Sequence, residues 1–125
     1  MDGFRVKRID ELQSIHDGLV KLAGDELGVE SFGLQVLDFP GGFEHYPEHD
    51  HAADGQEEVY VVLAGSCALG AAGERVTLDA GSIAWVAPGT SRRIDPGPDG
   101  VRILAIGCTV EGTYERPQDF RLAHA

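Results

Sequence analysis

The sequence predicts an all-β barrel or sandwich that carries a short helix near its N-terminus. From residue 29 to residue 108, short runs rich in β-branched and aromatic side chains recur at intervals of roughly 8 to 12 residues, with glycine and proline between them. The 17 glycines suit a fold with many tight turns. A length of 125 residues is enough for one domain with a buried core.

The N-terminal quarter predicts an arm followed by a helix. Residues 4–9 alternate apolar and basic side chains, which indicates a short strand or an extended arm. In residues 10–27 apolar side chains recur every three or four positions, as in an amphipathic helix. These are Leu12, Ile15, Leu19, Leu22, Ala23 and Leu27. Asp10 suits the helix N-cap, His16 should face solvent, and Gly18 and Gly24 weaken the pattern.

The remaining segments predict strands joined by turns. Residues 29–39 should form a strand that ends at Pro40, and residues 43–51 a second extended piece with a kink at Pro47. Residues 58–63 form the next strand, which stops at Gly65, and residues 66–70 and 74–78 form a hairpin. Residues 83–87 and 92–94 precede a turn at 95–100, and the aliphatic run 101–108 predicts a central strand covered on both faces. We expect the tail to pack as an arm or to be partly disordered.

Composition excludes several classes of partner. A net charge of −11 repels nucleic acid and anionic lipid surfaces. No apolar run approaches the ~18 residues of a membrane span, and no signal peptide core follows the N-terminus, so we expect a cytoplasmic protein. The two cysteines, Cys67 and Cys108, lie in apolar runs and predict reduced packing residues rather than a disulfide.

A pair of histidines forms the most informative pattern. Because side chains alternate along a strand, His49 and His51 would point the same way, about 6 to 7 Å apart. Glu58 begins the following strand, so two imidazoles would face a carboxylate, a common set of metal ligands. Three interpretations remain open: metal ligands, histidines of a metal-free pocket, or simple surface histidines. His45 has the same parity and is a possible extra ligand.

This stretch resembles the first motif of the cupins, G-x5-H-x-H-x3,4-E-x6-G. Glu58 and Gly65 fit it, with six residues between them. Six residues also lie between His51 and Glu58, where the motif has three or four, so the turn carries an insertion. Counting forward from His51 places the glutamate position at Gln56, which is therefore a second candidate ligand. The resemblance implies a double-stranded β-helix, or jelly-roll barrel.

The second cupin motif, G-x5-P-x-G-x2-H-x3-N, is matched in part. Gly81 and Gly89 fit it, Pro88 lies one place after the motif's proline, and Asp95 lies one place before the position of the asparagine. Arg92 occupies the position of the third metal-binding histidine. A guanidinium has no lone pair for a metal and would repel a divalent cation.

Two arrangements resolve this conflict. In the first, His49, His51 and Glu58 hold Fe, Mn, Ni or Zn, and Arg92 swings away to hold a small polar or anionic substrate. The resemblance then implies an oxygenase, isomerase or lyase. In the second, no metal binds, Arg92 pairs with Glu58 or with an anionic ligand, and the protein is a binding or sensing module. A third possibility is a scaffold that mainly dimerises.

The predicted organisation is an N-terminal arm and helix at 1–30, a cupin barrel at 31–110 and a C-terminal tail at 111–125. The expected partners are a small-molecule ligand and a second copy of the chain, in a homodimer, with no nucleic acid or membrane partner. Tyr60 shares the face of Glu58, where it would hydrogen-bond a ligand or fill the interior. Trp85 lies in the middle of a predicted strand and should fill the core.

Overall fold

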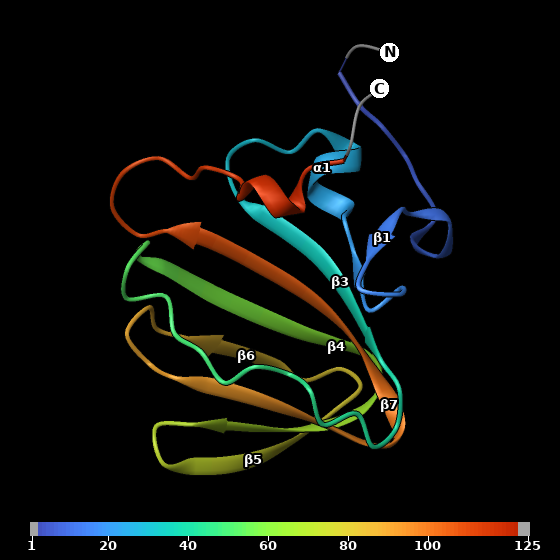
Figure 1. Ribbon diagram of the computed structural model, residues 1–125, viewed down its shortest axis with the longest axis vertical. Coiled ribbons are helices and arrows are strands. Elements are labelled where there is room, and N and C mark those ends of the chain that lie inside the picture. Colours follow the sequence, from blue (N-terminus) through green and yellow to red (C-terminus); the bar gives the residue numbers. More distant parts are fainter. Residues whose placement is uncertain (1–2, 123–125) are drawn as a thin grey trace.

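The computed structural model describes residues 3–122 as a two-layered, largely antiparallel β structure (Figure 1). Its strands are β1 (Ser14–Ile15), β2 (Val20–Lys21), β3 (Gly33–Phe39), β4 (Gln56–Ala71), β5 (Glu74–Asp79), β6 (Ile83–Val86) and β7 (Arg92–Thr109). Hydrogen bonds link them in the order β1-β2-β3-β7-β4-β5, and β6 pairs with β4. The helical elements are α1 (Ala23–Leu27) and two short 3-10 turns, η1 (Ile9–Glu11) and η2 (Gln118–Phe120).

The two long strands, β4 and β7, belong to both layers. They run antiparallel along almost their whole length, and both bend at the same end of the molecule (Figure 1). The pairing is irregular there, between Val62 and Ala64 and again between Gly65 and Cys67. Gly65 has φ +73, and a Cβ on it would lie 2.1 Å from the carbonyl oxygen of Gly100, so only glycine fits. Gly65 therefore bends a continuous strand and does not end it.

The turn predicted at residues 95–100 is wrong, because the chain bends there within a continuous strand. These residues belong to β7, where Asp95 pairs with Ala68 and Pro96 with Cys67. Proline lacks an amide hydrogen, so it is tolerated where the ladder is already irregular. The predicted hairpin of residues 66–70 and 74–78 is confirmed by the pairing of β4 with β5.

The core lies between the two layers. Its buried members are Leu37, Phe39, Tyr60, Val62, Cys67, Leu69, Leu78, Val86, Ile94, Val101, Ile103 and Ala105. Residues 101–108 alternate between buried and half-buried side chains, so the prediction of a strand covered on both faces is only partly right. Leu104 faces outward and packs against a second cluster built on Leu12, Ala23 and Val36.

The long helix predicted at residues 10–27 is wrong. Only Ala23–Leu27 is α-helical, and most of the segment is a hairpin whose β2 extends the sheet beyond β3. The hairpin turns through His16 and Asp17, both at φ 56, and Gly18 at φ 87. Leu12, Leu22 and Ala23 are still buried, because a hairpin laid along the sheet edge can bury the same apolar residues. It also satisfies the backbone groups that β3 would otherwise leave unpaired.

Several smaller expectations are decided by the structure. Residues 43–51 form no strand, and His49 makes a single bridge to Arg92. Trp85 is 62% exposed rather than buried, and its indole nitrogen donates to Glu57. Both cysteines are free; Cys67 is buried and Cys108 half-buried.

The two chain ends pack against each other and across β3. Tyr114 is buried, and Arg116 forms an ion pair with Asp25 of α1. The tail thus packs as an arm as far as residue 122, and residues 123–125 lie outside the described part of the chain. No helix within residues 3–122 has the length and apolar character needed to cross a membrane.

Candidate metal centre

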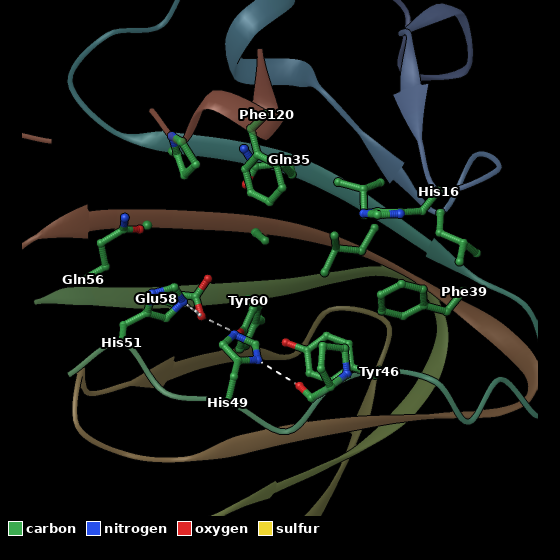
Figure 2. A pocket seen from close by; sticks show the side chains of 18 of the residues that line it. His16, Gln35, Phe39, Tyr46, His49, His51, Gln56, Glu58, Tyr60 and Phe120 are labelled. Atoms are coloured by element: carbon green, nitrogen blue, oxygen red, sulfur yellow. Dashed lines mark hydrogen bonds and ion pairs between the residues drawn. The ribbon is translucent and has the colours of Figure 1, made fainter. Parts of the chain in front are cut away.

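A cavity of about 620 Å³ opens between the inner face of the sheet and the loop of residues 43–54 (Figure 2). Strand β3 contributes Gln35, Leu37 and Phe39, and β7 contributes Ala105 and Gly107. Strand β4 contributes Gln56, Glu58 and Tyr60, which share one face because side chains alternate along a strand. The loop supplies the opposite wall and carries all the histidines predicted as ligands.

His49, His51 and Glu58 converge at one end of this cavity. One potential ligand atom from each lies within 4.8 Å of the other two. Small side-chain rotations from this spacing bring three donors to the ~2.0–2.2 Å at which zinc binds nitrogen and oxygen. The two imidazole rings meet edge to face with their centroids 5.2 Å apart. The structure therefore brings together the three residues that the histidine pattern singled out.

Backbone contacts hold the histidine loop against the sheet. The amide of His49 donates to the carbonyl of Arg92 at 3.1 Å, and the amide of Arg92 donates back to the carbonyl of His49 at 2.8 Å. The amide of His51 donates to the carbonyl of Pro88 at 2.7 Å. The two histidines therefore point the same way although the loop is not a strand.

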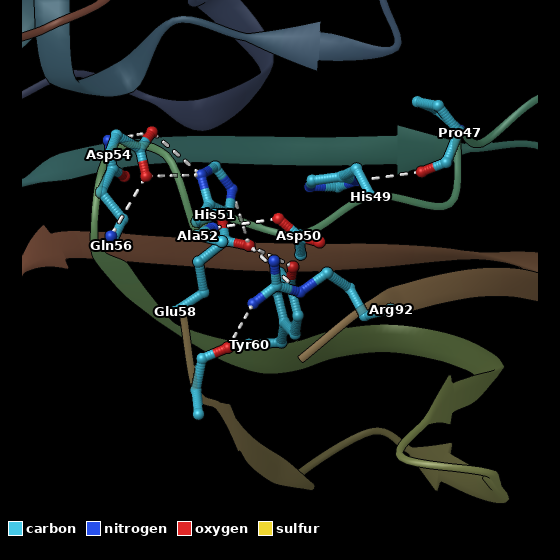
Figure 3. A network of polar contacts seen from close by, with 11 residues as sticks. Pro47, His49, Asp50, His51, Ala52, Asp54, Gln56, Glu58, Tyr60 and Arg92 are labelled. Atoms are coloured by element: carbon cyan, nitrogen blue, oxygen red, sulfur yellow. Dashed lines mark hydrogen bonds and ion pairs between the residues drawn. The ribbon is translucent and has the colours of Figure 1, made fainter. Parts of the chain in front are cut away.

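Each imidazole has its Nδ1 engaged on the side away from Glu58. Nδ1 of His49 lies 2.9 Å from the carbonyl oxygen of Pro47, to which it donates, and Nδ1 of His51 lies 3.1 Å from both carboxylate oxygens of Asp54 (Figure 3). Because a carbonyl and a carboxylate only accept, each Nδ1 carries a hydrogen, and Nε2 is the ring nitrogen left for a metal. Histidine ligands of metals are oriented by such contacts, most often to a carboxylate or a backbone carbonyl.

Asp54 belongs to the turn between His51 and Glu58, which is longer here than in the first cupin motif. Its carboxylate also accepts a hydrogen bond from the backbone amide of Gln56 at 3.1 Å, and the amide of Gly55 donates to the carbonyl of His51 at 2.8 Å. Partial burial raises the pKa of Asp54, but the hydrogen bonds from His51 and Gln56 outweigh it and hold the pKa below its usual range. The insertion thus supplies an ionised carboxylate that orients a candidate ligand.

Glu58 is held by three neighbours. Its Oε1 accepts a hydrogen bond from the hydroxyl of Tyr60 at 2.7 Å, lies 3.3 Å from Nε2 of His51, and lies 3.7 Å from Nε of Arg92. Tyr60 is almost fully buried and its hydroxyl is occupied by Glu58. Tyr60 therefore positions the carboxylate in this structure, which is a different role from the predicted contact with a ligand.

Arg92 does not occupy the position predicted for a substrate-binding residue. Its side chain is 0% exposed and is not among the residues that line the cavity. The guanidinium is directed at Glu58, and its Nη2 donates to the carbonyl of Ala87 at 3.2 Å (Figure 3). Its Nε and Nη1 have no hydrogen-bond partner within residues 3–122. Arg92 is thus paired with Glu58, as in the second of the two predicted arrangements, and the expectation that it holds an anionic ligand stays a prediction.

The two alternative ligands lie outside the cluster. Gln56 is buried, and its side-chain amide donates to Asp54 at 3.3 Å. His45 is exposed, meets Phe43 edge to face, and lines the cavity outside the cluster of His49, His51 and Glu58. Between the candidates left open by the insertion, the structure places Glu58 beside the histidines.

Two buried tyrosines extend the polar network. Burial raises the pKa of Tyr46 to about 12, although a hydrogen bond with Tyr60 opposes the shift. Burial, together with the nearby Tyr46 and Glu58, raises the pKa of Tyr60 still further. Both hydroxyls therefore stay protonated at neutral pH, and that of Tyr60 donates to Glu58.

Some residues of the site could not be found in the sequence. Asp54 has a local signal, because a carboxylate three residues after a histidine can reach its ring in a tight turn. Tyr46, Gln35 and Phe120 have none, because the loop, β3 and the tail come together only in the folded chain (Figure 2). His16 is exposed as predicted, and it also lies at the rim of the cavity.

Comparisons with known proteins agree on the fold. No family model matches the chain, and no curated protein matches it. A cupin protein from Bacteroides fragilis superposes with a TM-score of 0.68 at 18% identity and covers 100% of both chains. A sugar phosphate isomerase of the cupin superfamily from Silicibacter pomeroyi gives 0.69 at 17% identity, over 85% of this chain and 76% of the other.

A further solved structure is similar over most of its length. The predicted oxalate decarboxylase from Thermotoga maritima gives a TM-score of 0.67 at 21% identity, over 85% of this chain and 100% of the other. At these sequence identities the similarity establishes the fold, and the function must be inferred from the residues of the site. The all-β jelly-roll prediction is confirmed, and the chain has the cupin fold.

Proposed function

We propose that the protein is a metal-dependent cupin that acts on a small molecule, with His49, His51 and Glu58 as the metal ligands. The observation that carries the proposal is the convergence of these three donors within 4.8 Å at the wall of a cavity. Two imidazoles and one carboxylate with open positions suit Fe, Mn, Ni or Zn. When bound, such an ion would supply Lewis acidity or redox chemistry, which fits an oxygenase, isomerase or lyase.

The residues around the ligands support this proposal. Each histidine has its Nδ1 engaged, so Nε2 is the nitrogen left for a metal. Tyr60 holds Glu58 by a hydrogen bond and fixes the direction of its carboxylate. The contacts of Glu58 with Tyr60, His51 and Arg92 all fall on Oε1, which leaves Oε2 for a cation.

The contact between Arg92 and Glu58 also favours a second candidate, a metal-free binding or sensing protein. In that case the ion pair, at 3.7 Å, replaces the metal as the partner of Glu58. His49 and His51 would then bind the ligand by hydrogen bonds, or one of them would act as a general base.

Metal analysis separates the two candidates. We expect near-stoichiometric metal in protein purified without added metal or chelator, and none in the His49→Ala, His51→Ala double variant. A His45→Ala variant is the matched control, since His45 lines the cavity outside the cluster, and it should keep the metal. Metal-free parent protein that also fails to take up Fe(II), Mn, Ni or Zn would contradict the proposal and favour the second candidate.

The activities of the similar structures do not all suit this cavity. Oxalate is a dianion and a sugar phosphate carries a doubly charged group. Among the described residues that line the cavity there is no lysine or arginine, and Arg92 is buried elsewhere. A dianion would therefore have only the proposed metal and the lining histidines to offset its charge. We do not propose either activity for this chain.

We also propose that two copies of the chain form a cytoplasmic homodimer. Apolar side chains are exposed in the N-terminal arm, where Phe4 is 66% and Val6 81% accessible. Strand β6 also presents Ile83 and Trp85 to solvent. Light scattering should give the mass of two chains, and Trp85→Glu or Val6→Glu should lower it toward one chain. A monomeric parent protein would contradict this proposal.

A further inference from the structure

The cavity has two chemically different ends. The polar end holds His49, His51 and Glu58. The rest of the wall is mostly apolar and includes Leu19, Val20, Leu37, Phe39, Phe43, Ala105 and Phe120. At about 620 Å³ the cavity is far larger than the ion at its polar end requires, and its volume lies in the range of small-molecule sites.

Aromatic rings shape the apolar end. Phe39 and Phe43 stack with their centroids 5.2 Å apart, and Tyr46 meets Phe39 edge to face at 5.7 Å. Phe120 of η2 reaches the cavity from the side of β3 (Figure 2). Flat aromatic walls of this kind suit the ring or chain of an apolar ligand.

The permanent charges on the cavity wall are negative, and the histidines that also line it are His16, His45, His49 and His51. Asp17, Asp54 and Glu58 are the ionisable acids among its described lining residues, and none of that lining is lysine or arginine. The guanidinium of Arg92, near the polar end, is fully buried and paired with Glu58. A carboxylate placed at the apolar end would lose water without gaining a lysine or arginine partner among the described lining residues, which is unfavourable for an anion.

From these three features we infer the class of ligand: a molecule with one oxygen-donor headgroup at the histidine end and an uncharged, hydrophobic body along the apolar wall. The headgroup part of this inference rests on the proposed function, since it places the donor where the metal would be. The preference for an uncharged body depends only on the apolar wall. It holds for metal-free and metal-loaded protein alike.

The test compares two probes that differ in one distal charge. The first is 3-phenylpropan-1-ol, and the second is the same alcohol with a carboxylate at the para position of the ring. Binding is followed by chemical-shift titration of metal-free and of metal-loaded protein. We expect the carboxylate to bind at least tenfold more weakly in both forms.

Two charge-introducing variants check that the apolar wall causes the preference. Phe43→Arg places a cation at that wall, and we expect it to bring the two affinities to within about threefold. Val76→Arg introduces the same charge at an exposed position of β5 outside the cavity and should leave the tenfold difference intact. Phe43→Ala should weaken both probes together, and thermal unfolding shows that each variant is folded.

The outcomes separate this inference from the proposed function. Equal or tighter binding of the carboxylate to the parent protein, or no binding of the neutral alcohol to either form, would overturn the inference. If the protein takes up no metal but still prefers the neutral alcohol, the proposed function fails and the inference stands. If it is metal-loaded but shows no preference, the inference fails and the proposed function stands.

Discussion

Replacing Glu58 with glutamine should destabilise the metal-free protein, because it leaves a buried positive charge without a partner. Arg92 is 0% exposed, and its Nε lies 3.7 Å from Glu58. At that distance two unit charges attract by roughly 4 kcal/mol with an effective dielectric constant of about 20. Glu58 is itself only 16% exposed, so solvent screens the pair weakly. Breaking a buried ion pair from one side typically costs 3–5 kcal/mol, and we expect about 3 kcal/mol here.

Replacing Arg92 with methionine should cost less than replacing Glu58. This variant removes the guanidinium together with Nε and Nη1, which lack hydrogen-bond partners within the described residues. It leaves Glu58 with Tyr60 and His51 as neighbours. Because Glu58 keeps the hydrogen bond from Tyr60 and is 16% exposed, its carboxylate is left better satisfied than the buried guanidinium would be, and we expect a cost below about 2 kcal/mol.

Urea unfolding of the parent, both single variants and the double variant, with a chelator present, gives the coupling free energy. We expect at least about 2 kcal/mol of coupling between the two sites. Glu57→Gln is the matched control, because Glu57 points outward to Trp85, and it should change stability by less than about 0.5 kcal/mol. Additive effects of the two variants, or a larger cost for Arg92→Met than for Glu58→Gln, would refute the reasoning.

The remaining predictions concern metal affinity and alkaline stability. Asp54→Asn removes the carboxylate that orients His51 and should weaken metal binding roughly 10- to 100-fold, measured by competition with a chelator. Asp50→Asn is the control and should leave the affinity for metal unchanged. Equal effects of the two variants would contradict the orienting role of Asp54. Arg92→His replaces a cation with a fourth potential ligand and should tighten metal binding at least about tenfold, whereas unchanged affinity would show that this position does not face the ion. The pKa of Tyr46 is about 12 instead of the usual 10, so its contribution to stability is complete below pH 10 and is lost as the pH rises toward 12. Tyr46→Phe should therefore reduce the loss of stability between pH 10 and pH 12 by up to about 1.4 kcal/mol per pH unit in urea unfolding, and an unchanged slope would refute the assignment.

The candidate ligands were predictable because local patterns determine them. Two histidines two residues apart and a carboxylate at the start of a strand needed only the alternation of side chains and the spacing to Gly65. The structure keeps His49, His51 and Glu58 together although residues 43–51 form a loop. Bonds from the backbone of Arg92 and Pro88 provide the alignment that a strand was expected to provide.

The choice between Gln56 and Glu58 needed the folded inserted turn. Both residues lie on the same face of β4, so periodicity alone could not separate them. The turn places Asp54 where it accepts hydrogen bonds from both Gln56 and His51. That contact occupies the amide of Gln56 and leaves Glu58 beside the histidines.

The errors arose where long-range packing overrides a local pattern. The three- and four-residue spacing in residues 10–27 fits a helix, but the open edge of β3 recruits this segment as a hairpin. Prolines and glycines at residues 95–100 predict a turn, but the bend shared by β4 and β7 absorbs them inside a strand. The burial of Arg92 had no signal in the sequence, since arginine is rarely fully buried unless it is paired.

The most direct test of the metal centre is a crystal structure of the metal-loaded protein, with anomalous scattering recorded at the absorption edge of the bound metal. Our account predicts one peak at the polar end of the cavity, about 2.0–2.2 Å from an imidazole nitrogen of His49, an imidazole nitrogen of His51 and a carboxylate oxygen of Glu58. A peak bound through Gln56 or His45 in place of Glu58, or no peak at this end of the cavity, would contradict it.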